Sequence, residues 1–250
     1  RRTVSLAAAA TEHGPSGPPS SLAPRPLRHI AVPDGISVLH ADEALLVLDK
    51  PAGLLSVPGR GPDNADCLSA RVQSRYPDAL IVHRLDMATS GLIVMACGAA
   101  AQSALSLAFA RREVHKGYQA LVAGIPDACG ADQQGWSDIR LPQIVDWPNR
   151  PKSKVCLDTG KPSHTRWRLL GQERTAGLAT ARLELEPVTG RSHQLRVHLQ
   201  AIGHAILGDE LYADDAALAA APRLLLHACR IDLPHPVTGE RLCFESAPSF

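Results

Sequence analysis

Short apolar runs separated by polar turns fill the chain from about residue 36 onward. Most of these runs span roughly four to nine residues, a length that suits β-strands better than helices. In one of them Leu183 and Leu185 alternate with charged neighbours, as in a strand with one buried face. The pattern predicts strands at residues 36–39, 44–49, 79–82, 114–122, 163–170, 178–186, 224–228 and 241–245.

Three segments instead carry apolar side chains at helical spacing. They lie within residues 63–76, 99–112 and 192–203. In the third, Ser192 is the predicted N-cap and Gly203 the predicted stop. Because strands outnumber helices and no repeated βαβ unit occurs, we predict an α+β fold with a mixed, mainly antiparallel central sheet flanked by helices and loops.

Composition divides the chain into two parts. Residues 1–30 are rich in Ala, Pro, Ser and Gly, so they cannot bury enough apolar surface to offset their ordering entropy, and we predict a disordered tail. Residues 31–250 have the size and patterning of a folded catalytic domain. No apolar run approaches the ~20 residues that span a bilayer, so we expect no membrane partner, and we expect a monomer.

Charge and cysteine content narrow the class of protein further. The net charge is only +1, and the six cysteines form no C-x-x-C pair, which predicts reduced thiols in a cytoplasmic protein. Positive charge is nevertheless concentrated in residues 150–168, where six basic residues face one acid, Asp158. A solvated surface is the usual explanation of such a run, but it also suits contacts to phosphate. The six are Arg150, Lys152, Lys154, Lys161, Arg166 and Arg168.

An ionisable cluster lies between two apolar runs, at His83, Arg84 and Asp86. A turn between two buried strands would hold the Asp86 carboxylate at the edge of the core. Residue types alone favour a simpler interpretation, a surface ion pair between Arg84 and Asp86, worth roughly 0 to 1 kcal/mol.

The longer sequence strings resemble those of the RluA family of pseudouridine synthases. The clearest is His-Arg-Leu-Asp-x-x-Thr-Ser-Gly-Leu at residues 83–92, which is similar to the family's catalytic signature. Further similar strings are D-K-P-x-G at 49–53, K-x-Y-x-A at 116–120, T-G-R-x-H-Q-x-R-x-H at 189–198, G-D-x-x-Y at 208–212 and L-H-A at 226–228. The resemblance implies the pseudouridine synthase fold and an isomerase that converts uridine in RNA to pseudouridine.

The resemblance also implies roles for particular residues. Asp86 corresponds to the catalytic aspartate and Arg191, at the entrance of the third helix, would keep it ionised. Tyr118 would stack on the target base, although by residue type alone it could equally be a packing residue. Leu195 would pack beneath the pocket, and Arg84 would fill the space left by the flipped base. Lys50 is expected to be an ordinary solvated turn lysine.

The reaction changes no oxidation state and transfers no phosphoryl group, so we expect neither a cofactor nor a metal. RNA contacts are assigned to Arg84 and to Arg150, Lys152, Lys154 and Lys161. The string D-W-P-N-R-P-K-x-K-V-C at 146–156 resembles the member of the family that modifies both a tRNA and the large ribosomal RNA. That likeness implies uridine 32 of a tRNA anticodon stem-loop and uridine 746 of 23S rRNA as targets.

Three alternatives stay open at this point. The chain could act on a different ribosomal RNA site within the same family. It could bind RNA without catalysis, for which the basic segment suffices and Asp86 is not needed. A metallohydrolase is suggested by His193, His198 and His204, but spacings of five and six residues place these on different sides of a helix.

Overall fold

The computed structural model describes residues 35–250 except 60, 62 and 63. Within this part a ten-stranded mixed sheet has the order β1-β2-β4-β11-β5-β10-β9-β6, with β3 and β12 added at β4 and β11, and β7 and β8 form a separate hairpin. The strands are β1 (Ser37–Ala41), β2 (Leu45–Lys50), β3 (Ala79–Ile81), β4 (Ser90–Cys97), β5 (His115–Ala123), β6 (Ser137–Ile139), β7 (Gln143–Val145), β8 (Ser153–Val155), β9 (Thr165–Thr175), β10 (Leu178–Pro187), β11 (Leu226–Pro234) and β12 (Arg241–Glu245).

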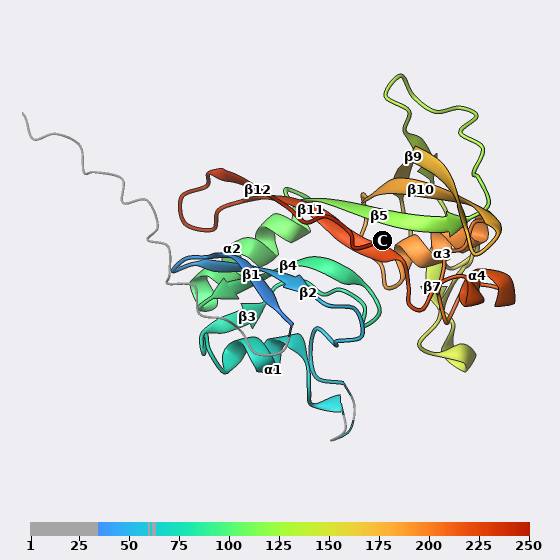
Figure 1. Ribbon diagram of the computed structural model, residues 1–250. Coiled ribbons are helices and arrows are strands. Elements are labelled where there is room, and N and C mark those ends of the chain that lie inside the picture. Colours follow the sequence, from blue (N-terminus) through green and yellow to red (C-terminus); the bar gives the residue numbers. More distant parts are fainter. Residues whose placement is uncertain (1–34, 60, 62–63) are drawn as a thin grey trace, which may run out of the picture.

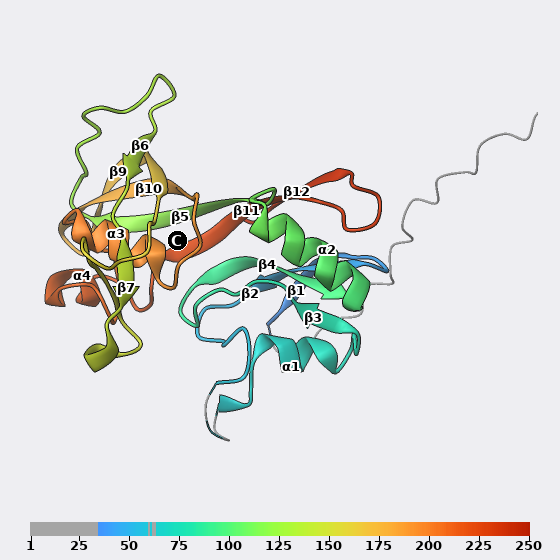
Figure 2. The same ribbon diagram turned by 180° about the vertical axis from the view of Figure 1, so that it is seen from behind.

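Helices gather at the two ends of this sheet. The helices are α1 (Leu68–Gln73), α2 (Ala99–Ala110), α3 (Gln194–Ala201) and α4 (Asp215–Ala219), with a 3-10 helix, η2 (Trp147–Asn149), at the tip of the β7–β8 hairpin. In Figure 1, α1 and α2 lie with β1–β4 at one end, and α3 and α4 lie with β6–β10 at the other. The view from behind shows β5 and β11 extending from one end of the sheet to the other, so that they join the two groups of elements (Figure 2). None of the helices in the described residues has the length and apolar content to span a membrane.

The central strands are apolar at successive positions because both sides of the sheet are covered. In β2, Leu46 and Leu48 belong to one hydrophobic cluster, while Leu45 and Val47 belong to a second cluster that includes Leu105 of α2. All four β2 side chains are fully buried. Burial on both faces explains why the sequence shows continuous apolar runs there rather than strict alternation.

The parallel pairing of β4 with β11 depends on Gly91. This residue has a φ of 109°, and a Cβ built on it would lie 2.3 Å from the carbonyl oxygen of Ala228. Only glycine fits such an approach. The loop immediately before it, residues 82–89, is therefore held at the point where the two halves of the sheet meet.

The predicted α+β class is confirmed, since the strand pairs are antiparallel apart from β4 with β11. The predicted helix at 192–203 begins later than expected. Ser192 is exposed and precedes the cap, and His193 is the N-cap residue with a left-handed backbone (φ 56°). The predicted tail at residues 1–30 lies outside the described residues.

Candidate active site

Asp86 lies on a loop that is held on both sides by hydrogen bonds. The Ser56 hydroxyl donates to the carbonyl of Leu85 (2.7 Å) and accepts from the amide of Leu85 (3.1 Å). The amide of Thr89 donates to the carbonyl of Asp86 (3.1 Å), which closes the turn. Residues 82–89 are a loop rather than a strand, and Arg84 is exposed and forms no ion pair with Asp86 in the described part of the chain. The structure thus excludes the simple Arg84–Asp86 pair.

Lys50 fastens the other side of the same loop. Its ammonium group donates to the carbonyls of Pro51 (2.8 Å), Leu54 (2.8 Å) and Met87 (3.1 Å), and Gly53 also donates to Met87 (2.8 Å). The expectation of a solvated turn lysine is wrong, because the side chain is fully buried. Burial lowers the pKa of Lys50 to about 8, against the opposing charges of Asp86 and Asp49. Lys50 and Gly53 of the D-K-P-x-G string therefore both donate to the carbonyl of Met87, and they fix this residue next to Asp86.

The cation that faces Asp86 is Arg196, in the first turn of α3. Its Nη1 lies 3.4 Å from Oδ2 of Asp86, while Nε and Nη2 donate to the two carboxylate oxygens of Asp209 at 2.8 and 2.7 Å. Burial by itself would lower the pKa of Arg196, but the hydrogen bonds and charge of Asp209, with the charge of Asp86, outweigh it and raise that pKa. A permanently charged guanidinium thus lies beside a carboxylate that is 31% exposed.

The expected pairing of Asp86 with Arg191 is not formed. Because α3 starts at Gln194, Arg191 precedes the helix and its side chain is exposed, while its amide is held by the side chain of Gln194 (3.1 Å). Five residues further on, Arg196 faces the interior and its side chain is only 5% exposed. The structure gives the ion-pairing role to Arg196 because this side chain lies on the buried side of the first turn of α3, whereas Arg191 lies before the N-cap residue His193.

Two further side chains complete the surroundings of Asp86. Nε2 of His193 lies 3.9 Å from Oδ2 of Asp86, and Nδ1 of His193 is hydrogen-bonded to the Tyr212 hydroxyl at 2.8 Å. That hydroxyl also accepts from the amide of Ser153 in β8 (2.8 Å), and the Tyr212 ring packs against the Arg196 guanidinium. The β7–β8 hairpin is therefore tied to the site through Tyr212.

Three predicted or neighbouring side chains of the site lie in the hydrophobic core. Leu85, Tyr118 and Leu195 are buried and belong to the same hydrophobic cluster. Tyr118 lies on β5 opposite Leu185 and Ala228, and burial, followed by the charge of Asp86, raises its pKa above the ordinary value. The predicted site residues Asp86, Tyr118 and Leu195 thus come from a loop, a strand and a helix; the charge of Asp86 acts on Tyr118, and Leu195 directly precedes Arg196 in α3.

The segment before α1 forms a hollow beside this loop. It has a volume of about 400 Å³ and includes Met87, the neighbour of Asp86, in its wall. The other lining residues are Pro51, Ala52, Gly53, Leu54, Leu55, Asn64, Asp66 and Arg71.

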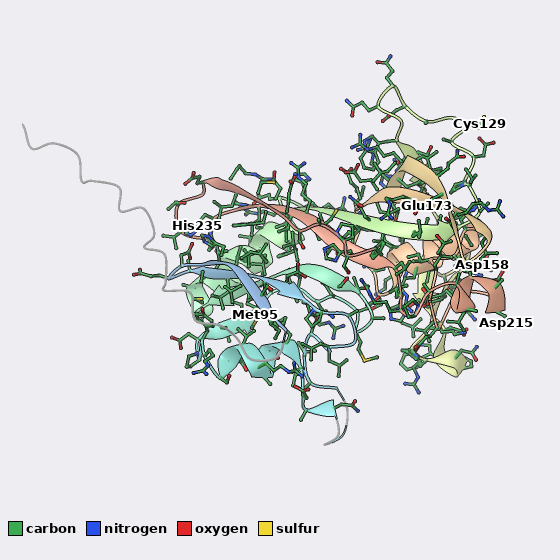
Figure 3. All side chains as sticks on the ribbon, viewed as in Figure 1. Met95, Cys129, Asp158, Glu173, Asp215 and His235 are labelled. Atoms are coloured by element: carbon green, nitrogen blue, oxygen red, sulfur yellow. The ribbon has the colours of Figure 1, made fainter. Side chains whose placement is uncertain are left out.

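The basic segment separates into two groups with different surroundings. Arg166 pairs with Asp132 and Glu186, and Arg168 pairs with Glu184, so these two arginines are held within the sheet region. The other group belongs to the hairpin and the loop after it: Arg150, Lys152, Lys154 and Lys161. Figure 3 shows Asp158, the acid within this run, at the end of the molecule where α3 and α4 lie.

The hairpin tip presents an exposed aromatic ring. Trp147 is 66% exposed, whereas Trp136 and Trp167 are buried, and the Arg150 guanidinium lies 4.6 Å from the Trp147 ring centre. Lys154 pairs with Asp146 at 3.1 Å, but in the described part of the chain no acid lies within ion-pair distance of Arg150, Lys152 or Lys161. Cations without acidic partners beside an exposed aromatic ring can contact phosphates and bases together.

The three histidines of the metallohydrolase alternative do not converge. His193 contacts Tyr212, His198 bonds to Thr165 and the carbonyl of Leu141, and His204 bonds to the carbonyl of Ala123. Over the described ranges, no group of three or more His, Cys, Asp or Glu side chains has an arrangement that could hold a metal ion.

Sequence reasoning missed Lys50, Arg196, Asp209 and Tyr212 as parts of the site. Each lies in a string that had been singled out, D-K-P-x-G, T-G-R-x-H-Q-x-R-x-H or G-D-x-x-Y. The available signal is therefore the presence of polar and charged residues within these strings, of which only Lys50 was given a role, that of a solvated turn lysine. Which of the two arginines in the second string faces inward could be decided only by the start of α3.

Comparison with known proteins identifies the class to which this site belongs. A model of the RNA pseudouridylate synthase family matches residues 44–201, which is more than half of the chain. The chain belongs to this family, and it is an RNA pseudouridine synthase, an isomerase.

Particular relatives agree with this assignment. The dual-specificity RNA pseudouridine synthase RluA of Escherichia coli (strain K12) is 49% identical over 213 residues, which cover 85% of this chain and 93% of the relative. The protein of the same name from Pasteurella multocida is 44% identical over 215 residues, with 86% and 94% covered. The solved structure of human RNA pseudouridylate synthase domain containing 1 has a TM-score of 0.72 at 26% identity, with 90% of this chain and 87% of that chain covered.

Proposed function

We propose that Asp86 is the catalytic carboxylate of this pseudouridine synthase. The reaction breaks the bond between ribose C1′ and uracil N1, forms a bond between C1′ and C5, removes the proton from C5 and places one on N1. Atoms and oxidation states balance without a further reactant. The chemistry needs an ionised carboxylate that can reach the nucleotide, acting as nucleophile or base.

One observation carries this proposal: the Asp86 carboxylate is partly exposed while fixed cations face it from inside. Arg196 lies 3.4 Å away, and the buried Lys50 ammonium group adds positive charge behind the loop. Opposite charges at this distance attract, so the cations hold the carboxylate in place. The surrounding hydrogen bonds fix the loop backbone, so little rearrangement is needed when a uridine enters the site.

Asp86→Asn tests this role directly. We expect it to abolish the release of tritium from C5-labelled uridine in RNA while the affinity for RNA is kept, because an amide cannot act as the nucleophile or base. Asp78→Asn, at an exposed acid directly before β3, is the matched control and should release tritium at the normal rate. Normal tritium release by Asp86→Asn would refute the proposed role and would leave a different residue as the catalyst.

We further propose that RNA lies across the β7–β8 hairpin and reaches the site from there. Among the residues that the structure describes, no acid lies within ion-pair distance of Arg150, Lys152 or Lys161, and the hairpin is joined to the site by the hydrogen bond between Ser153 and Tyr212. Arg84 is exposed two residues before Asp86, where it could take the place of the extruded base, and Tyr118 would support that base from β5. The targets are then unpaired loop uridines, whose bases cost least to extrude.

Salt dependence tests the proposed RNA surface. Each phosphate contact that is lost should reduce the slope of log affinity against log salt by about 1. We expect Lys152→Ala to reduce the slope, and Lys154→Ala to reduce it less because Asp146 already pairs with Lys154. Arg111→Ala, an exposed arginine at the end of α2, is the control. An unchanged slope for Lys152→Ala would place the RNA elsewhere on the molecule.

The relatives named dual-specificity synthases favour two RNA substrates. We propose uridine 32 of a tRNA anticodon stem-loop and uridine 746 of 23S rRNA. The six cysteines are free thiols, which supports action in the reducing cytoplasm. Mapping pseudouridines in cells that lack this protein tests the assignment. If the pseudouridines at positions 32 and 746 remain and one at another ribosomal position is lost, that position is the target instead.

A further inference from the structure

His193 occupies a conformation that most residues avoid. It is the N-cap of α3 and has a φ of 56°, in the left-handed region where side chains other than glycine are uncommon. Its side chain makes no capping hydrogen bond to the helix. Residues held in this way are concentrated at functional sites, where surrounding contacts fix them.

The contacts of His193 define which ring nitrogen carries its hydrogen. The Tyr212 hydroxyl oxygen accepts from the amide of Ser153 (2.8 Å), and within the described residues its only neighbour able to accept the hydroxyl hydrogen is Nδ1 of His193 (2.8 Å). The bonding is satisfied when Tyr212 donates to Nδ1. The hydrogen of the neutral ring is then on Nε2, which faces Oδ2 of Asp86 at 3.9 Å.

The charge state of the ring agrees with this arrangement. Burial lowers the pKa of His193 and Arg196 lowers it further, whereas the carboxylates of Asp86 and Asp209 oppose the shift. The net shift is downward, so the imidazole is neutral at physiological pH.

Both donors that face Asp86 approach the same oxygen. Arg196 lies 3.4 Å and His193 3.9 Å from Oδ2, while among the described residues no donor is hydrogen-bonded to Oδ1. The carboxylate is therefore held from one side only. The oxygen without a protein donor is the one that can meet the nucleotide.

We propose that His193 is a positioning residue for the isomerisation: with its tautomer set by Tyr212 and the hairpin amide of Ser153, its Nε2–H faces Oδ2 of Asp86 beside the Arg196 hydrogen bond to the same oxygen, and so keeps Oδ1 turned toward the target nucleotide. This inference rests on the proposed role of Asp86. It also gives the hairpin a second role, because displacement of β8 would release Tyr212 and with it the orientation of His193.

Variants of His193 separate positioning from folding. Asparagine tolerates the left-handed backbone but is too short to reach Asp86, whereas glutamine places an amide N–H close to the position of Nε2. We expect His193→Asn to lower kcat about 10- to 100-fold with an unchanged KM for RNA, as for a misplaced reacting group. We expect His193→Gln to restore kcat to within about threefold of the wild type by the same argument.

The position of the ring hydrogen of His193 can be measured, and it would not matter for catalysis if His193 only stabilised the fold. Nitrogen-15 NMR of the histidine rings should show the hydrogen of His193 on Nε2 in the wild-type protein. Tyr212→Phe removes only the hydroxyl, so it should shift hydrogen toward Nδ1 and lower kcat without raising KM.

Three results would overturn the inference: a wild-type kcat for His193→Asn, a kcat for His193→Gln as low as that of His193→Asn, or a ring hydrogen on Nδ1 in the wild-type protein. The NMR measurement needs no variant, so it decides even if one of them fails to fold. Asp86→Asn separates the two proposals. If it is inactive while His193→Asn is fully active, only the positioning inference fails, whereas an active Asp86→Asn removes the catalytic role itself.

Discussion

Asp209 should govern both the stability of the protein and the position of the cation beside Asp86. Its carboxylate is fully buried and accepts two hydrogen bonds from Arg196 at 2.8 and 2.7 Å, together with the amides of Leu211 and Tyr212. Asp209→Asn keeps the size of the side chain but removes its charge. An amide can accept at one oxygen only, so its NH₂ group would face the guanidinium.

The expected loss follows from these bonds. A hydrogen bond to a charged group contributes about 1.5 to 3 kcal/mol, and removing one partner of a buried ion pair typically costs about 3 to 5 kcal/mol. Asp86 remains as a second carboxylate for Arg196 at 3.4 Å and offsets part of the loss. We therefore expect the free energy of unfolding to fall by about 3 kcal/mol. The guanidinium would also move relative to Asp86, so kcat/KM should fall about 10- to 100-fold.

Urea unfolding followed by circular dichroism at neutral pH measures the first effect, and tritium release well below the unfolding midpoint measures the second. Asp215→Asn is the matched control, because Asp215 is exposed on α4 at the edge of the molecule (Figure 3) and makes no ion pair in the described part of the chain. A loss below about 1 kcal/mol for Asp209→Asn, or one equal to that of the control, would refute the claim that this carboxylate anchors Arg196.

Two further predictions concern the loop anchor and the hairpin tip. The pKa of Lys50 is about 8 in the folded protein and 10.5 without burial, so the unfolded chain binds more protons between these values and stability should rise with pH by on the order of 3 kcal/mol. Lys50→Met should remove this rise and take the Lys50 hydrogen bonds from the carbonyls of Pro51, Leu54 and Met87, of which Met87 keeps its bond from Gly53. Urea midpoints from pH 7.5 to 10.5 measure the effect, and an identical pH profile would contradict the burial argument. Trp147→Ala should weaken RNA binding about 10-fold, as for the loss of one stacked base, with the salt slope unchanged in fluorescence anisotropy titrations. Leu107→Ala, an exposed apolar residue on α2, is its control, and an altered salt slope would show that charge rather than stacking had been lost.

Local sequence determined most of the elements and the family. Apolar runs predict β2 and β10 to within a residue of their observed bounds, β2 because successive positions are buried on both faces and β10 because buried and partly exposed positions alternate. The three-residue strands β6, β7 and β8 are not predicted, because runs this short carry no clear periodicity. The turn before Gly91 is predicted from the polar residues between two apolar runs, whereas the close approach of Ala228 that requires a glycine there appears only in the structure. The strings around Asp86 and before α3 pointed to the reaction, and the family match agrees with them.

The tertiary structure decided which charges meet. Arg191 and Arg196 lie in one string, but Arg191 precedes the N-cap of α3 and is exposed, whereas Arg196 lies in the first turn and is buried against Asp86 and Asp209. By sequence Lys50 is an ordinary turn lysine, but in the structure its ammonium group is buried and donates to three carbonyls. Burial and ion pairing depend on contacts between residues far apart in the chain, such as the 110 positions between Asp86 and Arg196, and no local pattern encodes them.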